Sequence, residues 1–212
     1  MVRYFLVLSS FFALYSPLHS SSNVFFSPDD KVTSHLIHAI NNAKTKIYGA
    51  IYLITDKKIA NALIDAKNNR QLDVQIVTDQ SNLESDYGKA QYLKQNGIDI
   101  FVFKPMSGKK QKYPPLMHNK FAIIDNKVWT GSFNWTVSAN KKNLENVTVI
   151  DEKAVRDKYL DQFEKLKRKC VYQPSITKKM VRRRKPWYKK AVKNVDHFLT
   201  MVKRKIGHSK KS

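Results

Sequence analysis

His118 and Lys120, near the middle of the chain, have side chains suited to phosphoryl chemistry. They are two positions apart, so on a β-strand both side chains point to the same face. Ser132 and Asn134 follow shortly after and are also two positions apart. An imidazole can attack phosphorus or carry protons, and an ammonium can bind phosphate oxygens. Hydroxyl and amide groups can donate hydrogen bonds to those oxygens. Together these groups could attack and hold a phosphodiester.

The residues between the two pairs predict a β-hairpin that brings both pairs to one edge. The apolar run 121–124 is typical of a buried strand, and Asp125-Asn126 is typical of a turn. The run 128–130 predicts the returning strand, which ends in small residues before Asn134. Asp125 is therefore expected to support the hairpin rather than to carry protons.

The complete pattern resembles the signature of the phospholipase D superfamily. It consists of His118-x-Lys120, four residues, Asp125, and then Gly131-Ser132-x-Asn134. The spacing between Asp125 and Gly131 is one residue shorter than is usual in that family. The run 143–146, with Glu145 at its third position, resembles the acidic element that follows the signature.

This resemblance implies a metal-independent phosphodiesterase that needs no cofactor and works through a phosphohistidine. His118 would be the nucleophile or the general acid, and Lys120 would bind the phosphate oxygens. Two neutral donors would assist, and Glu145 would hold the imidazole of His118 in its working tautomer. The expected catalytic set is His118, Lys120, Asp125, Ser132, Asn134 and Glu145.

The number of motifs predicts a second feature, a homodimer. The mechanism of the superfamily uses two histidines, whereas this chain contains one complete motif. A symmetric dimer would place His118 of both copies across a two-fold axis and so complete the site. By resemblance, members of the family with a single motif, the small bacterial endonucleases and the mitochondrial cardiolipin hydrolase, are built in this way.

The charge of the chain points to a polyanionic partner. Among 212 residues, 39 are Lys or Arg and 17 are Asp or Glu, which gives a formal net charge of +22. Both nucleic acid and anionic phospholipid fit this excess. The single cysteine, Cys170, excludes an intramolecular disulfide, and the six histidines do not cluster in the sequence, so no metal site is expected.

Three regions are expected along the chain. Residues 1–22 combine an early arginine, an apolar stretch and small residues, which predicts a signal peptide and a secreted or periplasmic protein. An uncleaved N-terminal membrane anchor is the alternative. Residues 23–172 would form the catalytic domain. Residues 173–212 would form a basic linker and an amphipathic helix, which could dock on the domain, lie on a membrane or contact nucleic acid.

Within the domain, helical and strand patterns alternate. The expected fold is therefore an α/β sandwich of the phospholipase D type, with a mixed, largely parallel central sheet flanked by helices and a basic helical tail. Strands are predicted over 46–54, 74–77, 98–103 and 147–150, and helices over 56–68, 85–95 and 152–169. The polar loop 106–115 leads into His118, so its lysines are expected to bind substrate. These lysines are Lys109, Lys110 and Lys112.

Three functions fit these features. The favoured one is a secreted, non-specific endonuclease that grips nucleic acid through its phosphates. The second is a phospholipase D or cardiolipin-type lipid hydrolase, because residues 113–117 (YPPLM) make the rim before His118 partly apolar. The third is a protein that binds nucleic acid or membrane without turnover. The intact set of catalytic residues argues against the third, because a pure binder needs no nucleophile.

Overall fold

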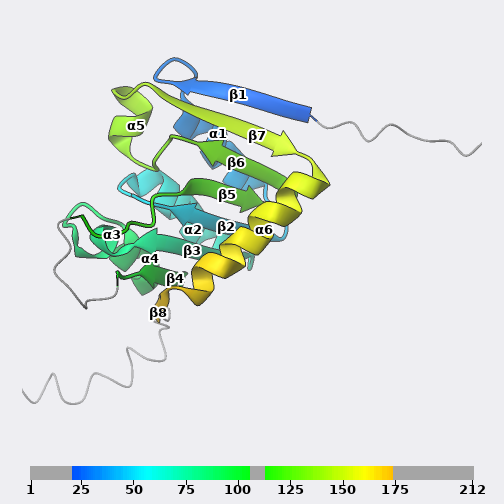
Figure 1. The fold of residues 1–212 in the computed structure, drawn as a ribbon. Helices are drawn as coiled ribbons and strands as arrows, with labels where there is room; N and C mark the ends of the chain where they lie inside the picture. Colours follow the sequence, from blue (N-terminus) through cyan, green and yellow to red (C-terminus); the bar gives the residue numbers. More distant parts are fainter. Residues whose placement is uncertain (1–20, 106–112, 174–212) are drawn as a thin grey trace, which may run out of the picture.

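The computed structural model describes residues 21–105 and 113–173, which form one eight-stranded sheet with helices on both faces (Figure 1). The strands are β1 (Ser21–Ser27), β2 (Lys46–Ile51), β3 (Asp73–Asp79), β4 (Asp99–Phe103), β5 (Lys120–Ile124), β6 (Lys127–Gly131), β7 (Glu145–Asp151) and β8 (Val171–Gln173). The helices are α1 (Val32–Asn42), α2 (Lys57–Asn68), α3 (Gln80–Glu84), α4 (Ala90–Gln95), α5 (Val137–Lys141) and α6 (Lys153–Arg168). The strand order is β1-β7-β6-β5-β2-β3-β4-β8.

The sheet is mixed, as predicted, but mostly antiparallel. Only β2–β3 and β3–β4 pair in parallel, and the other neighbouring strands pair antiparallel. The mixed α/β fold is therefore confirmed, whereas the expectation of a largely parallel sheet is wrong. A parallel pair needs a crossover, and the alternation of helix and strand supplies crossovers only as far as β4. Beyond β4 the chain adds a hairpin, and β1, β7 and β8 extend the sheet with antiparallel pairs.

Two hydrophobic cores hold the helices against the sheet. On one face, Leu36 of α1 and Leu63 of α2 pack with side chains from the middle strands. On the other face, α6 crosses the strands diagonally (Figure 1) and buries Phe163 completely. The ring of Phe163 stacks on Tyr48 of β2 with centroids 5.1 Å apart. Burial on both faces explains why the central strands read as continuous apolar runs.

Three elements differ from the sequence-based prediction. Of the helix expected over 85–95, only α4 (Ala90–Gln95) forms. A turn separates it from α3, which lies before the expected range. A Cβ at Gly88 would lie 2.0 Å from the carbonyl oxygen of Asn82, so the chain folds back closely at a glycine instead of continuing as one helix. The other two differences are β1 and β8, which were not expected as strands. β1 pairs along its whole length with β7, and β8 pairs antiparallel with β4.

The predicted terminal segments lie almost entirely outside the described residues. Ser21 and Ser22, the last two residues of the expected signal segment, belong to β1, and Gln173, the first residue of the expected basic tail, belongs to β8. Among the helices that the structure describes, none has the length and apolar character needed to cross a membrane.

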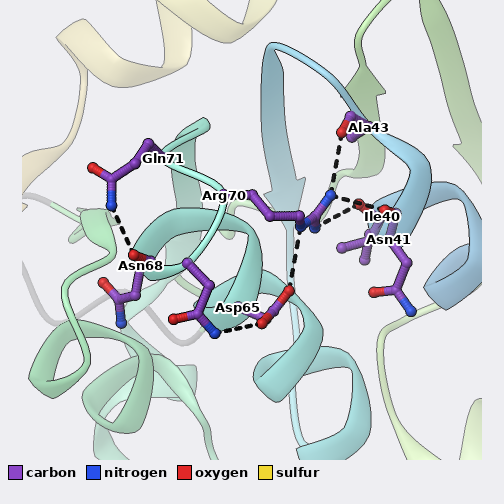
Figure 2. Close-up of polar contacts among 8 residues, drawn as sticks. Ile40, Asn41, Ala43, Asp65, Asn68, Arg70 and Gln71 are labelled. Carbon is purple, nitrogen blue, oxygen red and sulfur yellow. Dashed lines mark hydrogen bonds and ion pairs between the residues drawn. The ribbon is translucent and has the colours of Figure 1, made fainter.

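Arg70 joins α1 to the loop after α2 (Figure 2). Its guanidinium donates to the carbonyl oxygens of Ile40, at 2.9 Å, Asn41, at 2.9 Å, and Ala43, at 3.2 Å. It also pairs with Asp65 of α2 at 3.2 Å. The last carbonyls of a helix have no partner within the helix, so one side chain here supplies donors to the end of α1. This contact holds α1 and α2 together on the same face of the sheet.

Candidate active site

The predicted catalytic residues come from strand ends that meet at one edge of the sheet. Lys120 at the start of β5 pairs with Ile51 at the end of β2. Gly131 at the end of β6 pairs with Val147 near the start of β7. The segments that carry His118, Ser132, Asn134 and Glu145 therefore converge at this edge, which we call the catalytic edge. The carboxyl ends of the parallel strands β2, β3 and β4 lie at the same edge.

His118 is exposed at the catalytic edge, and backbone contacts fix it on both sides. The amide of Met117 donates to Oδ2 of Asp79 at 3.0 Å, and both of these residues are buried. The amide of Tyr52 donates to the carbonyl oxygen of Asn119 at 2.8 Å. The ring of Tyr52 also lies against the imidazole of His118, with centroids 4.6 Å apart and planes tilted by 54°. The backbone on either side of His118 is therefore fixed, and the exposed imidazole remains accessible to a substrate.

Lys120 lies beside the same aromatic ring. Its Nζ donates to the carbonyl oxygen of His118 at 2.8 Å and sits 5.1 Å from the centroid of the Tyr52 ring. Burial lowers the pKa of Lys120, and the nearby carboxylate of Glu145 opposes this shift in part. The structure thus brings the ammonium, the imidazole and the carboxylate close together at one place.

Ser132 and Asn134 are held by contacts that cross the catalytic edge. The amide of Ser132 donates to the carbonyl oxygen of Asn146 at 3.1 Å, and its Oγ accepts from the amide of Asn146 at 3.1 Å. Oδ1 of Asn134 accepts from the amide of Leu53 at 3.3 Å. These bonds use the oxygen atoms of both side chains as acceptors. The hydroxyl hydrogen of Ser132 and the Nδ2 group of Asn134 are thus the donors suited to a phosphate.

Comparison with known proteins agrees with this arrangement. The family described as "Cardiolipin synthase, PLD-like domain" matches residues 36–167. The chain belongs to the phospholipase D superfamily. It is 38% identical over 147 residues to a protein named "Phospholipase D" from Rickettsia prowazekii, covering 68% of this chain and 67% of that one. It is 26% identical over 138 residues to "Mitochondrial cardiolipin hydrolase" from Xenopus laevis, covering 65% of this chain and 61% of that one. Members of the superfamily are phosphodiesterases, and the chain is an enzyme of this class.

Two solved structures resemble the fold over their whole length. NucT from Helicobacter pylori aligns with a TM-score of 0.66 and 28% identity, covering 72% of this chain and 99% of that one. The phospholipase D family member Nuc from Salmonella typhimurium aligns with a TM-score of 0.64 and 30% identity, covering 74% of this chain and 100% of that one. The fold that these two proteins share therefore accounts for most of the described residues.

Glu145 lies at the catalytic edge of this phospholipase D domain, but not in the contact that was expected. Its Oε1 accepts from Nδ2 of Asn143 at 3.0 Å, and its charge acts on Lys120. Within the described part of the chain, no hydrogen bond joins Glu145 to His118. Its role in orienting the imidazole therefore stays a prediction.

Asp125 lies at the opposite end of the hairpin from His118. It occupies the tight turn between β5 and β6 with φ of 50°. Its carboxylate accepts from the amides of Lys44, at 2.7 Å, Thr45, at 2.8 Å, and Lys46, at 3.1 Å, and from the hydroxyl of Thr45 at 2.8 Å. Asp125 thus ties the hairpin to the start of β2 and does not touch the reacting groups. A hollow of about 490 Å³ beside this turn is likewise separate from the catalytic edge.

The contacts of Asp125 predict that its contribution to the stability of the protein is lost at low pH. Burial alone would raise its pKa, but the hydrogen bonds from residues 44–46 together lower it. A carboxyl whose pKa is lower in the folded state contributes stability above its unfolded pKa, about 3.9, and loses it as the pH falls through the folded value. Asp125→Ala is therefore expected to lower the free energy of unfolding by about 2 kcal/mol at pH 7.

Urea unfolding at pH 7 and below about pH 3.9 measures this effect, because the difference between wild type and Asp125→Ala should shrink in acid. Asp161→Ala, which removes an exposed carboxylate on α6, is the matched control. A difference that stays constant across this pH range would contradict the assignment.

Two residues of the site were not predicted from the sequence, and others lie beyond the described residues. Tyr52 touches both His118 and Lys120, and Asp79 anchors the segment before His118. Neither belongs to a motif. The structure does not describe Lys109, Lys110 and Lys112, so their role as substrate-binding residues stays a prediction. In the described ranges, no group of three or more His, Cys, Asp or Glu residues is placed to hold a metal ion.

Proposed function

We propose that the protein is a metal-independent endonuclease that works through a phosphohistidine. The observation that carries this proposal is the open catalytic edge, where the exposed His118 and the cation of Lys120 both adjoin the ring of Tyr52. Proteins that bind single-stranded nucleic acid combine cations for the phosphates with aromatic rings for the bases. The full-length likeness to Nuc and NucT and the net charge of +22 support the same substrate.

The proposed reaction has two displacement steps. An imidazole nitrogen of His118 attacks phosphorus, so a P–N bond forms while the P–O bond to the leaving oxygen breaks. A second histidine gives its proton to that oxygen. Water then attacks the phosphohistidine and passes a proton to the second histidine, and the P–N bond breaks to restore His118. Lys120, Ser132 and Asn134 stabilise the charge on the phosphoryl oxygens throughout.

The second histidine is proposed to come from a second copy of the chain. Within the described residues, the other histidines are His35 and His38, and both lie on α1. His38 and Asp125 line the same hollow, at the end of the hairpin away from His118. A homodimer with its two-fold axis at the catalytic edge would bring the two copies of His118 together. Residues 1–22 are proposed to act as a signal peptide, which would make the enzyme secreted or periplasmic.

A lipid phosphodiesterase is the second candidate, because aliphatic and aromatic side chains are exposed around the catalytic edge. Leu144, next to Glu145, is 89% exposed, and Leu116, two residues before His118, is 51% exposed. Val137 of α5 and Phe26 at the end of β1 are also exposed. Exposed apolar side chains grouped near a site suit a bilayer surface or a protein partner. The relatives named Phospholipase D and Mitochondrial cardiolipin hydrolase support this candidate.

A paired assay in EDTA tests the proposal. The full chain is incubated with single-stranded and plasmid DNA in one tube, and with phosphatidylcholine or cardiolipin vesicles in the other. Each tube has a His118→Ala control. DNA cleavage that is lost in the variant is the expected result. Release of lipid products, lowered by Leu144→Ser, would favour the second candidate. If neither DNA cleavage nor lipid product is detected, the result contradicts both candidates and favours a binding protein without turnover.

A further inference from the structure

Another hollow, with two lysines in its lining, opens beside the catalytic edge. Its volume is about 320 Å³, and its lining residues come from the start of α2, the turn before α4 and α4 itself. They are Lys57, Asp86, Gly88, Lys89 and Tyr92. The chain enters α2 and α3 from the carboxyl ends of β2 and β3, so this hollow lies at the same end of the sheet as His118. Figure 1 shows α3 and α5 gathered at this end.

Hydrogen bonds connect the hollow to the catalytic segment. The amide of Lys89 donates to the carbonyl oxygen of Ile54 at 2.8 Å. The amides of Thr55 and Asp56 donate to the carbonyl oxygen of Trp135 at 2.9 and 3.1 Å. Trp135 directly follows Asn134 of the catalytic set. The hollow is therefore held in a defined position relative to the phosphate-binding donors.

The separation suits a short strand of a polymeric substrate. Tyr52, which touches His118, precedes Lys57 by five residues, and five residues span at most about 17 Å. A strand of a few extended nucleotides covers that distance, so a strand held at His118 would reach the hollow.

The side chains around the hollow can contact both parts of a nucleotide. Lys57 and Lys89 supply two positive charges, and Nζ of Lys89 donates to the carbonyl oxygen of Tyr87 at 2.8 Å. The side chain of Tyr87 is 78% exposed, so its ring is available for stacking. Cations that follow the backbone and rings that stack on bases are the two components of single-strand binding. Asp86 brings one negative charge, which would weaken the grip on phosphate.

We propose that this hollow is a substrate-binding subsite for the nucleic acid strand next to the scissile phosphodiester. In it, Lys57 and Lys89 bind a neighbouring phosphate, and Tyr87 stacks on a base. The assignment rests on the proposed nuclease function and adds to it a preference for polymeric, single-stranded substrate over small diesters.

Binding of a fluorescent single-stranded oligonucleotide tests the subsite. The full chain with His118→Ala is used so that no turnover occurs, and fluorescence anisotropy is measured at several salt concentrations. Adding Lys57→Ala and Lys89→Ala together should weaken binding roughly tenfold. It should also reduce the slope of log affinity against log salt by about 1.4, because each single-strand phosphate contact contributes about 0.7. Tyr87→Ser should weaken binding at least about fivefold.

Two further variants control for charge. Lys44→Ala with Lys158→Ala removes two exposed lysines away from the catalytic edge, and it should change affinity less than about twofold. Asp86→Asn should strengthen binding roughly twofold, which is opposite in sign to the lysine changes. Equal effects of the two lysine pairs, no binding of the oligonucleotide at all, or weaker binding by Asp86→Asn would overturn the subsite.

Turnover separates this proposal from the nuclease proposal. In the active chain, Lys57→Ala with Lys89→Ala should lower kcat/KM for an oligonucleotide roughly tenfold more than kcat/KM for bis(4-nitrophenyl) phosphate. An equal loss on both substrates would place these lysines outside a strand-binding subsite. If the wild-type chain hydrolyses the small diester but leaves the oligonucleotide intact, the nuclease proposal fails, whatever the binding data give.

Discussion

Replacing His118 with alanine is expected to lower kcat/KM for phosphodiester hydrolysis by a factor on the order of 10⁴ or more. The imidazole is exposed at the catalytic edge, next to the ammonium of Lys120, and nothing else at this edge offers a comparable nitrogen nucleophile among the described residues. Removing it takes away the P–N bond on which both displacement steps depend. Initial rates on a small chromogenic diester and on DNA measure the loss.

His38→Ala is the matched control, because His38 is an exposed histidine on α1 whose ring, among the described residues, hydrogen-bonds to Asn42 of its own helix. It should leave the rates within about twofold of wild type. Circular dichroism and thermal unfolding of both variants show whether each remains folded. Substantial activity in folded His118→Ala protein would remove His118 from the role of nucleophile.

Mixing wild-type and His118→Ala chains tests whether the proposed dimer shares one active site. If one active site uses His118 from both copies, an equal mixture of wild-type and His118→Ala chains leaves activity only in dimers of two wild-type chains. Random assembly would make these about one quarter of all dimers, whereas independent sites would retain about one half of the activity. Activity near one half after full subunit exchange, or activity of an isolated monomer, would contradict a shared site.

The hairpin and its chemistry could be predicted from the sequence because both depend on local spacing. Two pairs of residues at intervals of two, joined by a strand, a turn and a strand, define which side chains meet at the catalytic edge. The structure forms β5 and β6 around Asp125 as expected, although the motif is one residue shorter than usual. The residue pair Asp125-Asn126, which is typical of a turn, also predicted that Asp125 supports the hairpin.

The remaining features depend on contacts between distant parts of the chain, which spacing does not reveal. Asp79 lies 38 residues before Met117, yet it fixes the backbone beside His118. The pairing of β1 with β7 joins two strands that are far apart in the sequence, and it adds one more antiparallel pair at this side of the sheet. Tyr52 directly follows β2 and belongs to no motif, so only the register of β2 against β5 places it at the imidazole.

Gly131→Ala is expected to lower kcat/KM by about 10²-fold, because this position has no room for a side chain and holds the catalytic segment in place. A Cβ at Gly131 would lie 2.1 Å from the carbonyl oxygen of Asn146. That oxygen accepts the amide of Ser132 and belongs to the residue after Glu145. The backbone of β6 and β7 must therefore separate, which moves Ser132 and Glu145 apart. The free energy of unfolding should fall by about 1–3 kcal/mol.

Gly49→Ala is the comparison that separates a stability effect from a geometric one. A Cβ there would lie 3.0 Å from Cδ1 of Ile76 and 3.1 Å from Cη2 of Trp135, which are side-chain atoms rather than the backbone oxygen met at Gly131. This variant should lose stability without a matching loss of kcat/KM. Steady-state kinetics and urea unfolding of both variants give the two quantities. If Gly131→Ala keeps kcat/KM within about threefold of wild type while it is folded, close contact between β6 and β7 is not what positions the catalytic groups.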